Sequence, residues 1–278
     1  MASALAQQLA QLSAAKGPQE KYVKGKASLL FDHQKAADVS AETLLGIAQQ
    51  GLEVLCKVQK NFAPFPESLF SRASLSIARD QLTKEENAQL NTNLRAFLQV
   101  LTNHFLAPAA FQALEYCIRR YQVHVHNVPD LLLCCLPYHS TPEFARVVAL
   151  LQLKGTAWEW LAPCQQSGAP PPRQLLVRRC VNDQAVLREV CRGAEAVGQP
   201  GCFSKTYLSF YAVLLCEVLA ASPHVTEALL TTLLPFLAAG LKETVVKDYR
   251  AATLMVLTQL LSRAQLSTDF LAGHPWRV

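Results

Sequence analysis

Three histidines and two cysteines form the group whose residue types and spacing come nearest to a metal site. They are His124, His126, His139, Cys134 and Cys135. Residues two apart in a helix point to different faces, so His124 and His126 would share an ion only in an extended segment. Zinc ligands also recur at tighter spacings. We expect these two histidines in the C-terminal turn of a helix, where the helix dipole favours them, and we predict no metal or other cofactor.

Gly193 and Gly198 have the spacing of the glycines in a phosphate-binding loop. Gln199 and Pro200 stand where that loop requires lysine followed by serine or threonine. Without the lysine no phosphate clamp forms, so we interpret the segment as a turn. The sequence contains no G-x-S-x-G, H-E-x-x-H or G-x-G-x-x-G motif. We therefore predict that the chain is not an enzyme.

The densest basic stretch of the chain is a candidate contact for phosphate or for an acidic partner, because guanidinium groups suit both. Its members are Arg173, Arg178, Arg179, Arg188 and Arg192. Only Asp183 and Glu189 oppose them within the stretch. A solvated helix face explains the same pattern, and we prefer that interpretation. A second basic run, between residues 16 and 26, is interpreted as a connector.

The composition is that of a chain with a large apolar core. Of 278 residues, 51% are hydrophobic and 17% are charged, which is far from the composition of a disordered chain. The net charge of +5 is too small to indicate a nucleic-acid surface by itself. Nine cysteines without a Cys-x-x-Cys motif indicate buried reduced thiols. With no signal-peptide pattern and no apolar run long enough to cross a membrane, we expect a soluble intracellular protein.

Helical signals recur along the whole chain, whereas the alternation typical of strands is almost absent. Ser40 is a predicted N-cap, and Thr83 with Glu86 is a predicted capping box. Pro108 is predicted to lie at the start of the following helix. A segment rich in proline, glycine, serine and glutamine, at about residues 163–172, is predicted to be a loop.

The stretch 228–261 carries the clearest repeat signal. Two amphipathic runs, separated by a short joint, have apolar residues at helical spacing. Ser222 and Pro223 are expected to open this pair of helices. The pair looks like a HEAT repeat, a unit that stacks into scaffolds. Asp248 and Arg250 at the start of its second helix are interpreted as a structural signature that ties one repeat to its neighbour.

The pattern predicts an all-α fold, specifically an α-solenoid of degenerate HEAT-like antiparallel helix pairs. We divide the chain into three parts. Residues 1–38 are expected to form a short helix and a basic connector, residues 39–264 the solenoid, and residues 265–278 an atypical C-terminal tail.

Several short motifs, in order along the chain, carry a resemblance to a known family. They are LAQQLAQL at 5–12, ASLLFD at 27–32, CCLPYH at 134–139 followed by FARVVALLQL at 144–153, WEWL at 158–161 and KDYRAATLMVL at 247–257. Together they resemble the family of HEAT repeat-containing protein 1 and U3 small nucleolar RNA-associated protein 10. Members of that family are several times longer, so the resemblance implies that this chain corresponds to their N-terminal region.

The resemblance implies a non-catalytic scaffold of the small-subunit processome in the nucleus and nucleolus. Such a scaffold takes part in pre-18S rRNA processing and supports ribosomal DNA transcription by RNA polymerase I. The implied partners are WD-repeat proteins of the early 5′ external transcribed spacer subcomplex, the U3 ribonucleoprotein and pre-rRNA, with no membrane and no small-molecule substrate.

Two alternatives remain open at this point. A generic HEAT-repeat adaptor for transport or signalling would hold partner peptides or GTPases in its groove and would not concentrate in the nucleolus. A helical metalloenzyme using His124, His126 and His139 would carry stoichiometric metal, and we expect none.

Overall fold

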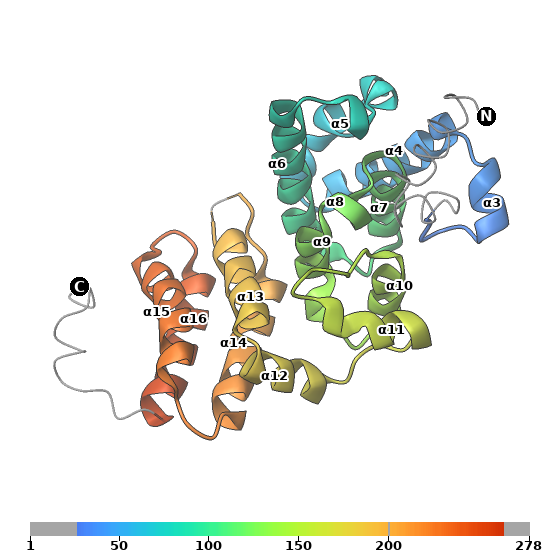
Figure 1. Cartoon of the computed structure of the whole chain (residues 1–278). Coiled ribbons are helices and arrows are strands. Elements are labelled where there is room, and N and C mark those ends of the chain that lie inside the picture. The colour runs from blue at the N-terminus through green and yellow to red at the C-terminus, as the bar shows by residue number, and fades with distance from the viewer. Residues whose placement is uncertain (1–26, 200, 264–278) are drawn as a thin grey trace, which may run out of the picture.

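The computed structural model describes residues 27–199 and 201–263. Every regular element in these two ranges is helical, and no strand occurs in them (Figure 1). The predicted all-α fold is therefore confirmed. Among the same residues, no helix is both long and apolar enough to cross a bilayer.

The part of the array nearer the N-terminus contains nine α-helices among the described residues. They are α3 (His33–Asp38), α4 (Ala41–Val58), α5 (Phe65–Ser68), α6 (Lys84–Leu101), α7 (Pro108–Tyr121), α8 (Val123–His126), α9 (Val128–Cys135), α10 (Pro142–Leu150) and α11 (Ala162–Ser167). Short 3-10 turns connect several of these helices. They are η1 (Lys60–Phe62), η2 (Arg72–Ser76), η3 (Arg79–Gln81), η4 (Thr102–His104), η5 (Leu136–Tyr138) and η6 (Glu159–Leu161).

The part nearer the C-terminus is more regular. It consists of α12 (Arg173–Asn182), α13 (Gln184–Val197), α14 (Lys205–Ala221), α15 (Glu227–Lys242) and α16 (Lys247–Arg263). Helices α12, α14 and α16 pack side by side in one layer, while α13 and α15 pack side by side in the other. Helix α13 also contacts α14, and α15 contacts α16. This two-layer stacking of helix pairs is an α-solenoid, as the sequence predicted.

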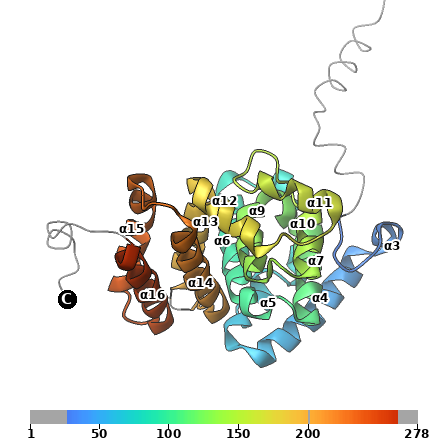
Figure 2. The same ribbon diagram turned by 90° about the horizontal axis from the view of Figure 1, so that it is seen from below.

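The array continues without a break into the preceding helices. Helix α9 packs against both α6 and α13, and α4 packs against α7. Buried hydrophobic side chains from α4 to α16 form one contiguous cluster. In Figure 2 the helices follow one another across the molecule, from α3 at one end to α15 and α16 at the other. Stacked helices that share one core are expected to resist unfolding together with their neighbours.

Local capping signals in the sequence are confirmed where they were strongest. The Ser40 side chain accepts a hydrogen bond from the Thr43 amide at 3.1 Å and begins α4. Thr83 and Glu86 form the predicted reciprocal capping box of α6. Pro108 is the first residue of α7, where its missing N–H is no loss.

Two other local predictions are wrong. Ser222 caps the C-terminus of α14, and the side chain of Thr226 begins α15 instead. Gly193 lies inside α13 and not in a turn, and the helix continues to Val197. Thr226 is itself a local capping signal, whereas at Gly193 the packing of Tyr207 against α13 leaves room only for glycine.

The segment predicted to be a loop at about 163–172 is partly helical. Residues up to Ser167 belong to α11, which ends at Gly168 with a φ of +66°. Only the residues that follow, up to Pro172, form the connection to α12. The predicted tail at 265–278 lies outside the described residues, and so do residues 1–26, which hold the predicted short helix and most of the predicted connector. The proposed division into three parts therefore stays a prediction.

Residues 27–38 pack onto the array through a buried carboxylate. The side chain of Glu115 in α7 is 1% exposed and accepts hydrogen bonds from the Leu29 amide at 2.6 Å and the Ser28 hydroxyl at 2.7 Å. It also accepts from the Leu30 amide at 3.2 Å. Arg119, one turn later, lies 3.7 Å from the same carboxylate and donates to the Ala36 carbonyl at 2.8 Å. This segment is therefore held by charge-assisted hydrogen bonds as well as by its apolar side chains.

The cysteines are free, and burial suppresses their ionisation. Six of the nine are buried: Cys117, Cys134, Cys135, Cys164, Cys180 and Cys191. Burial raises the pKa of the Cys134 thiol, for example, to about 12. A thiol of that kind packs as a small apolar group and is a poor nucleophile at neutral pH.

Candidate functional site: a pocket between α6, α9 and α13

The described part of the chain has a small pocket where the two parts of the array meet. Its volume is about 110 Å³, and residues of α6, η4, α9, α13 and α14 line it. These elements span more than 100 residues of sequence, from Arg95 to Tyr207. The pocket is therefore a product of helix stacking and not of any one repeat.

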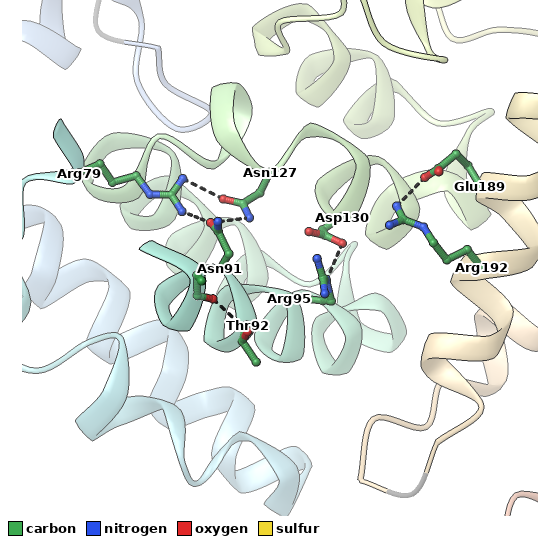
Figure 3. A network of polar contacts seen from close by, with 9 residues as sticks. Arg79, Asn91, Thr92, Arg95, Asn127, Asp130, Glu189 and Arg192 are labelled. Carbon is green, nitrogen blue, oxygen red and sulfur yellow. Dashed lines mark hydrogen bonds and ion pairs between the residues drawn. The ribbon is translucent and has the colours of Figure 1, made fainter. Parts of the chain in front are cut away.

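Two arginines stand at the rim of the pocket, each paired with a carboxylate of this chain (Figure 3). Arg95 in α6 donates from Nε to Asp130 in α9 at 3.1 Å. Arg192 donates from Nη2 to Glu189, one turn earlier in α13, at 2.5 Å. The Arg95 side chain is 50% exposed and that of Asp130 13%. The Arg192 side chain is 44% exposed and that of Glu189 25%, so in both pairs the guanidinium is the more exposed partner. A molecule approaching the pocket therefore meets guanidinium before carboxylate.

The floor of the pocket is apolar. Leu133, Cys134 and Val197 line it and are each less than a tenth exposed. Gly193 lines it as well, because this position admits no side chain. A Cβ there would lie 2.2 Å from the Tyr207 hydroxyl and 3.1 Å from Leu133. The Tyr207 hydroxyl is already used, since it donates to the Val190 carbonyl at 3.1 Å.

A buried polar cluster fixes α6 against α9 beside the pocket. Arg79 is 6% exposed and donates to the side-chain carbonyl oxygens of Asn127, at 3.0 Å, and of Asn91. Asn127 in turn donates to Asn91 at 3.1 Å. Figure 3 shows this cluster next to the Arg95–Asp130 pair. Burial lowers the pKa of the Arg79 guanidinium. The two amides accept hydrogen bonds from its Nη1 and Nη2 groups, while its Nε is buried with no partner among the described residues.

The arginines predicted from the sequence as a candidate contact are distributed over two helices. Arg173 donates to Glu217 at 2.7 Å and lies 5.1 Å above the Phe210 ring, while Arg179 pairs with Asp183 at 3.0 Å. These pairs hold helices together or stabilise helix ends. Binding of phosphate or of an acidic partner by this stretch stays a prediction.

Arg178 and Arg188 are exposed, and neither forms an ion pair with another residue in the described ranges. Arg192 is the only one of the five predicted arginines among the residues that line the pocket. The sequence therefore pointed to one residue of the pocket, Arg192, but as a member of a basic stretch and not of a pocket.

Asp248 and Arg250 both lie in the first turn of α16 and are exposed. Within residues 27–199 and 201–263 neither side chain forms a hydrogen bond or an ion pair. The predicted tie between repeats would need a partner beyond these residues, so that role stays a prediction.

Of the three histidines that could ligate a metal, His139 is buried, His124 is partly buried and His126 is exposed. His124 and His126 belong to α8, a single helical turn that follows Gln122, whose φ is +49°. His139 is 6% exposed, and its ring packs 5.9 Å from the Phe210 ring. Among the described residues, no three His, Cys, Asp or Glu side chains come together as a metal site would require.

Acid is expected to destabilise the protein through His124. Burial, with a smaller contribution from the His126 charge, lowers the pKa of His124 to about 4, against a hydrogen bond with the Ile118 backbone that raises it. In the unfolded chain this histidine has its ordinary pKa of about 6.5, so it takes up a proton more readily than in the folded protein. The contribution of neutral His124 to stability is therefore fully present above pH 6.5 and is lost as the pH falls towards 4. We expect the free energy of unfolding to be about 2 kcal/mol lower at pH 5 than at pH 7 from this group.

Urea denaturation at several pH values measures this effect. The variant His124→Gln should lose a large part of the pH dependence between 6.5 and 4. His224 is exposed, so His224→Gln serves as the matched control and should leave the dependence as it is. Equal slopes for all three proteins would contradict the assignment to His124.

The pocket contains residues that sequence reasoning missed, chiefly Arg95, Gln99, Asp130 and Ala196. The only sequence signal for this site is the spacing of Arg95 and Gln99, which places them one turn apart on the same face of a helix. Nothing in the sequence says that this face of α6 meets α13.

No family model matches the chain. Individual relatives do match over most of its length. Human HEAT repeat-containing protein 1 is 34% identical over 253 residues, which is 88% of this chain and 12% of the relative. The Drosophila melanogaster homologue of that protein is 31% identical over 278 residues, 96% of this chain and 13% of the relative.

A fungal relative carries the second name. U3 small nucleolar RNA-associated protein 10 of Aspergillus niger is 30% identical over 291 residues, 98% of this chain and 16% of the relative. The chain thus spans between a tenth and a sixth of the length of the curated relatives it matches. Over that span, the chain belongs to the family of HEAT repeat-containing protein 1 and U3 small nucleolar RNA-associated protein 10.

Proposed function

We propose that this chain acts as a non-catalytic scaffold in ribosome biogenesis. The observation that carries the proposal is its similarity, over 98% of its length, to a protein named for its association with U3 small nucleolar RNA. The fold is suited to the role, because a stacked helical array offers long surfaces that hold several partners at fixed spacing. The pocket between α6, α9 and α13 suits binding, since both of its arginines are paired with carboxylates and burial raises the pKa of the Cys134 thiol in its floor to about 12.

In this proposal the chain works in the nucleolus as part of the small-subunit processome during pre-18S rRNA processing. Its partners are WD-repeat proteins of the subcomplex that engages the 5′ external transcribed spacer, with the U3 ribonucleoprotein and pre-rRNA contacted directly or through them. Support of ribosomal DNA transcription by RNA polymerase I belongs to the same proposal.

Affinity purification of the tagged chain from nuclear extract, followed by mass spectrometry and RNA sequencing, tests the proposal. We expect WD-repeat proteins of the processome together with U3 RNA and 5′ spacer RNA. A coherent set of transport or signalling proteins without these RNAs would favour the generic HEAT adaptor instead. The unfolded control is the Gly51→Leu variant, in which the close contact of α4 with α7 is blocked; it should recover only chaperones.

A further inference from the structure

We propose that the pocket between α6, α9 and α13 binds one aliphatic side chain of a partner's peptide segment, with acidic residues on either side of it. The inference deepens the proposed scaffold function, because it gives the chemistry of one bound segment. The size of the pocket, its apolar floor and the unused donors at its rim together indicate this ligand.

The size and the floor select the central side chain. A volume of about 110 Å³ is smaller than the range of about 300–1,000 Å³ typical of small-molecule sites. It is close to the cavity of about 150 Å³ that holds one benzene molecule in an engineered protein. The floor is formed by Leu133, Cys134 and Val197. A leucine, isoleucine or methionine side chain fits such a space and is favoured by leaving water.

The rim selects the flanking residues. Arg95 uses only Nε towards Asp130, and Arg192 uses only Nη2 towards Glu189. Each guanidinium carries five N–H donors, so both Nη groups of Arg95, and Nε and Nη1 of Arg192, have no acceptor among the described residues. The two Nη groups of Arg95 form a planar pair that matches a carboxylate in a two-point geometry, whereas Nε and Nη1 of Arg192 point to different sides and each offer a single hydrogen bond. Each arginine–carboxylate pair is neutral overall, but the guanidinium is its more exposed partner, so a ligand carboxylate reaches the arginine first.

Gln99 adds a contact for the backbone of the segment. It lines the pocket on the same face of α6 as Arg95, is partly exposed, and forms no hydrogen bond with its side chain to any described residue. A side-chain amide both donates and accepts. It therefore suits the backbone N–H and C=O of a peptide laid across the pocket mouth.

The same features disfavour RNA. Proteins that bind single-stranded nucleic acid stack its bases on exposed aromatic side chains. The only aromatic residue of the pocket, Tyr207, is 1% exposed, and its hydroxyl is already hydrogen-bonded. Two paired arginines without a stacking platform are a poor match for a nucleotide and a good match for an acidic peptide.

Selection from a displayed library of random twelve-residue peptides, with the full 278-residue chain as bait, tests the proposal. The enriched peptides are then synthesised with a fluorophore, and their dissociation constants are measured by anisotropy. Ala196 in α13 lines the pocket and is partly exposed, so the longer side chain of Ala196→Met should occupy the pocket. Ala185 is exposed near the start of the same helix, and Ala185→Met is the matched control.

We expect enriched peptides to carry a leucine, isoleucine or methionine flanked by aspartate or glutamate. Ala196→Met should weaken their binding at least tenfold, and Ala185→Met less than twofold. Arg95→Gln and Arg192→Gln should each weaken binding at least threefold, and these variants keep the test valid if Ala196→Met melts at a lower temperature than the wild type.

Three results would overturn the proposal. They are no enrichment, enrichment of peptides without the acid-flanked aliphatic residue, and binding that survives both Ala196→Met and the arginine variants. Twelve-nucleotide poly(U) RNA serves as the competing probe, and binding of this RNA with the same dependence on Ala196 would assign the pocket to RNA. The peptide selection uses purified protein alone, so a negative selection contradicts the pocket proposal and leaves the ribosome-assembly proposal untouched. Failure of the nuclear purification contradicts only the ribosome-assembly proposal.

Discussion

Replacement of Gly51 by alanine is expected to lower the free energy of unfolding by about 3 kcal/mol, as overpacking against a rigid neighbour does. Gly51 lies in the contact between α4 and α7. A Cβ at this position would lie 2.6 Å from the Ala109 carbonyl oxygen and 2.8 Å from Cβ of Gln112. Neither atom belongs to the flexible end of a side chain, so only a movement of one whole helix relieves the contact.

Gly46 in the same helix provides the matched control. Nothing lies within 4 Å of a Cβ built at Gly46, so alanine there meets open space. Alanine is the better helix former by about 1 kcal/mol. We therefore expect Gly46→Ala to raise the free energy of unfolding by about 0.5–1 kcal/mol, a change of opposite sign.

Urea denaturation of the two variants, followed by circular dichroism, measures both changes. Equal effects of Gly51→Ala and Gly46→Ala would mean that α4 and α7 do not pack as closely as described. The double variant should give the sum of the two changes, since the two residues share no partner.

Glu115→Ala is expected to lower the free energy of unfolding by about 3–5 kcal/mol, which is the usual loss when one partner of a buried charge pair is removed. The change leaves the Arg119 side chain, which is 8% exposed, without its carboxylate. It also removes the acceptor of the Leu29 amide and the Ser28 hydroxyl. Glu115→Gln should cost less, because the amide oxygen still accepts one of these hydrogen bonds.

Hydrogen exchange separates local from global loss. In Glu115→Ala the amides of Leu29 and Leu30 should exchange far faster, while those in the middle of α13 and α14 should change only with global stability. Glu53→Ala removes an acid of the exposed pair with Lys57 and should leave exchange and stability unchanged within error. Continued protection of Leu29 and Leu30 in Glu115→Ala would show that apolar packing alone holds the segment.

The sequence determined the class of fold because its signals are local. A 3.6-residue apolar period and side chains such as Ser40 and Thr83 act within a few residues of one another. Such patterns specify that a helix forms and, often, where it begins. They also carried the family resemblance, which consists of short motifs in a fixed order.

Tertiary structure alone decided which faces meet. Gly193 looked like part of a turn, yet it lies inside α13, at a position where Tyr207 occupies the space that a side chain would need. No pattern in the sequence marks Glu115, which is a buried acceptor for a segment 86 residues earlier. Arg95 reaches the pocket only because α6, α9 and α13 stack in one layer. Helical periodicity fixes which side of each helix is apolar, but the partner of that side depends on contacts between distant segments, which no local pattern encodes.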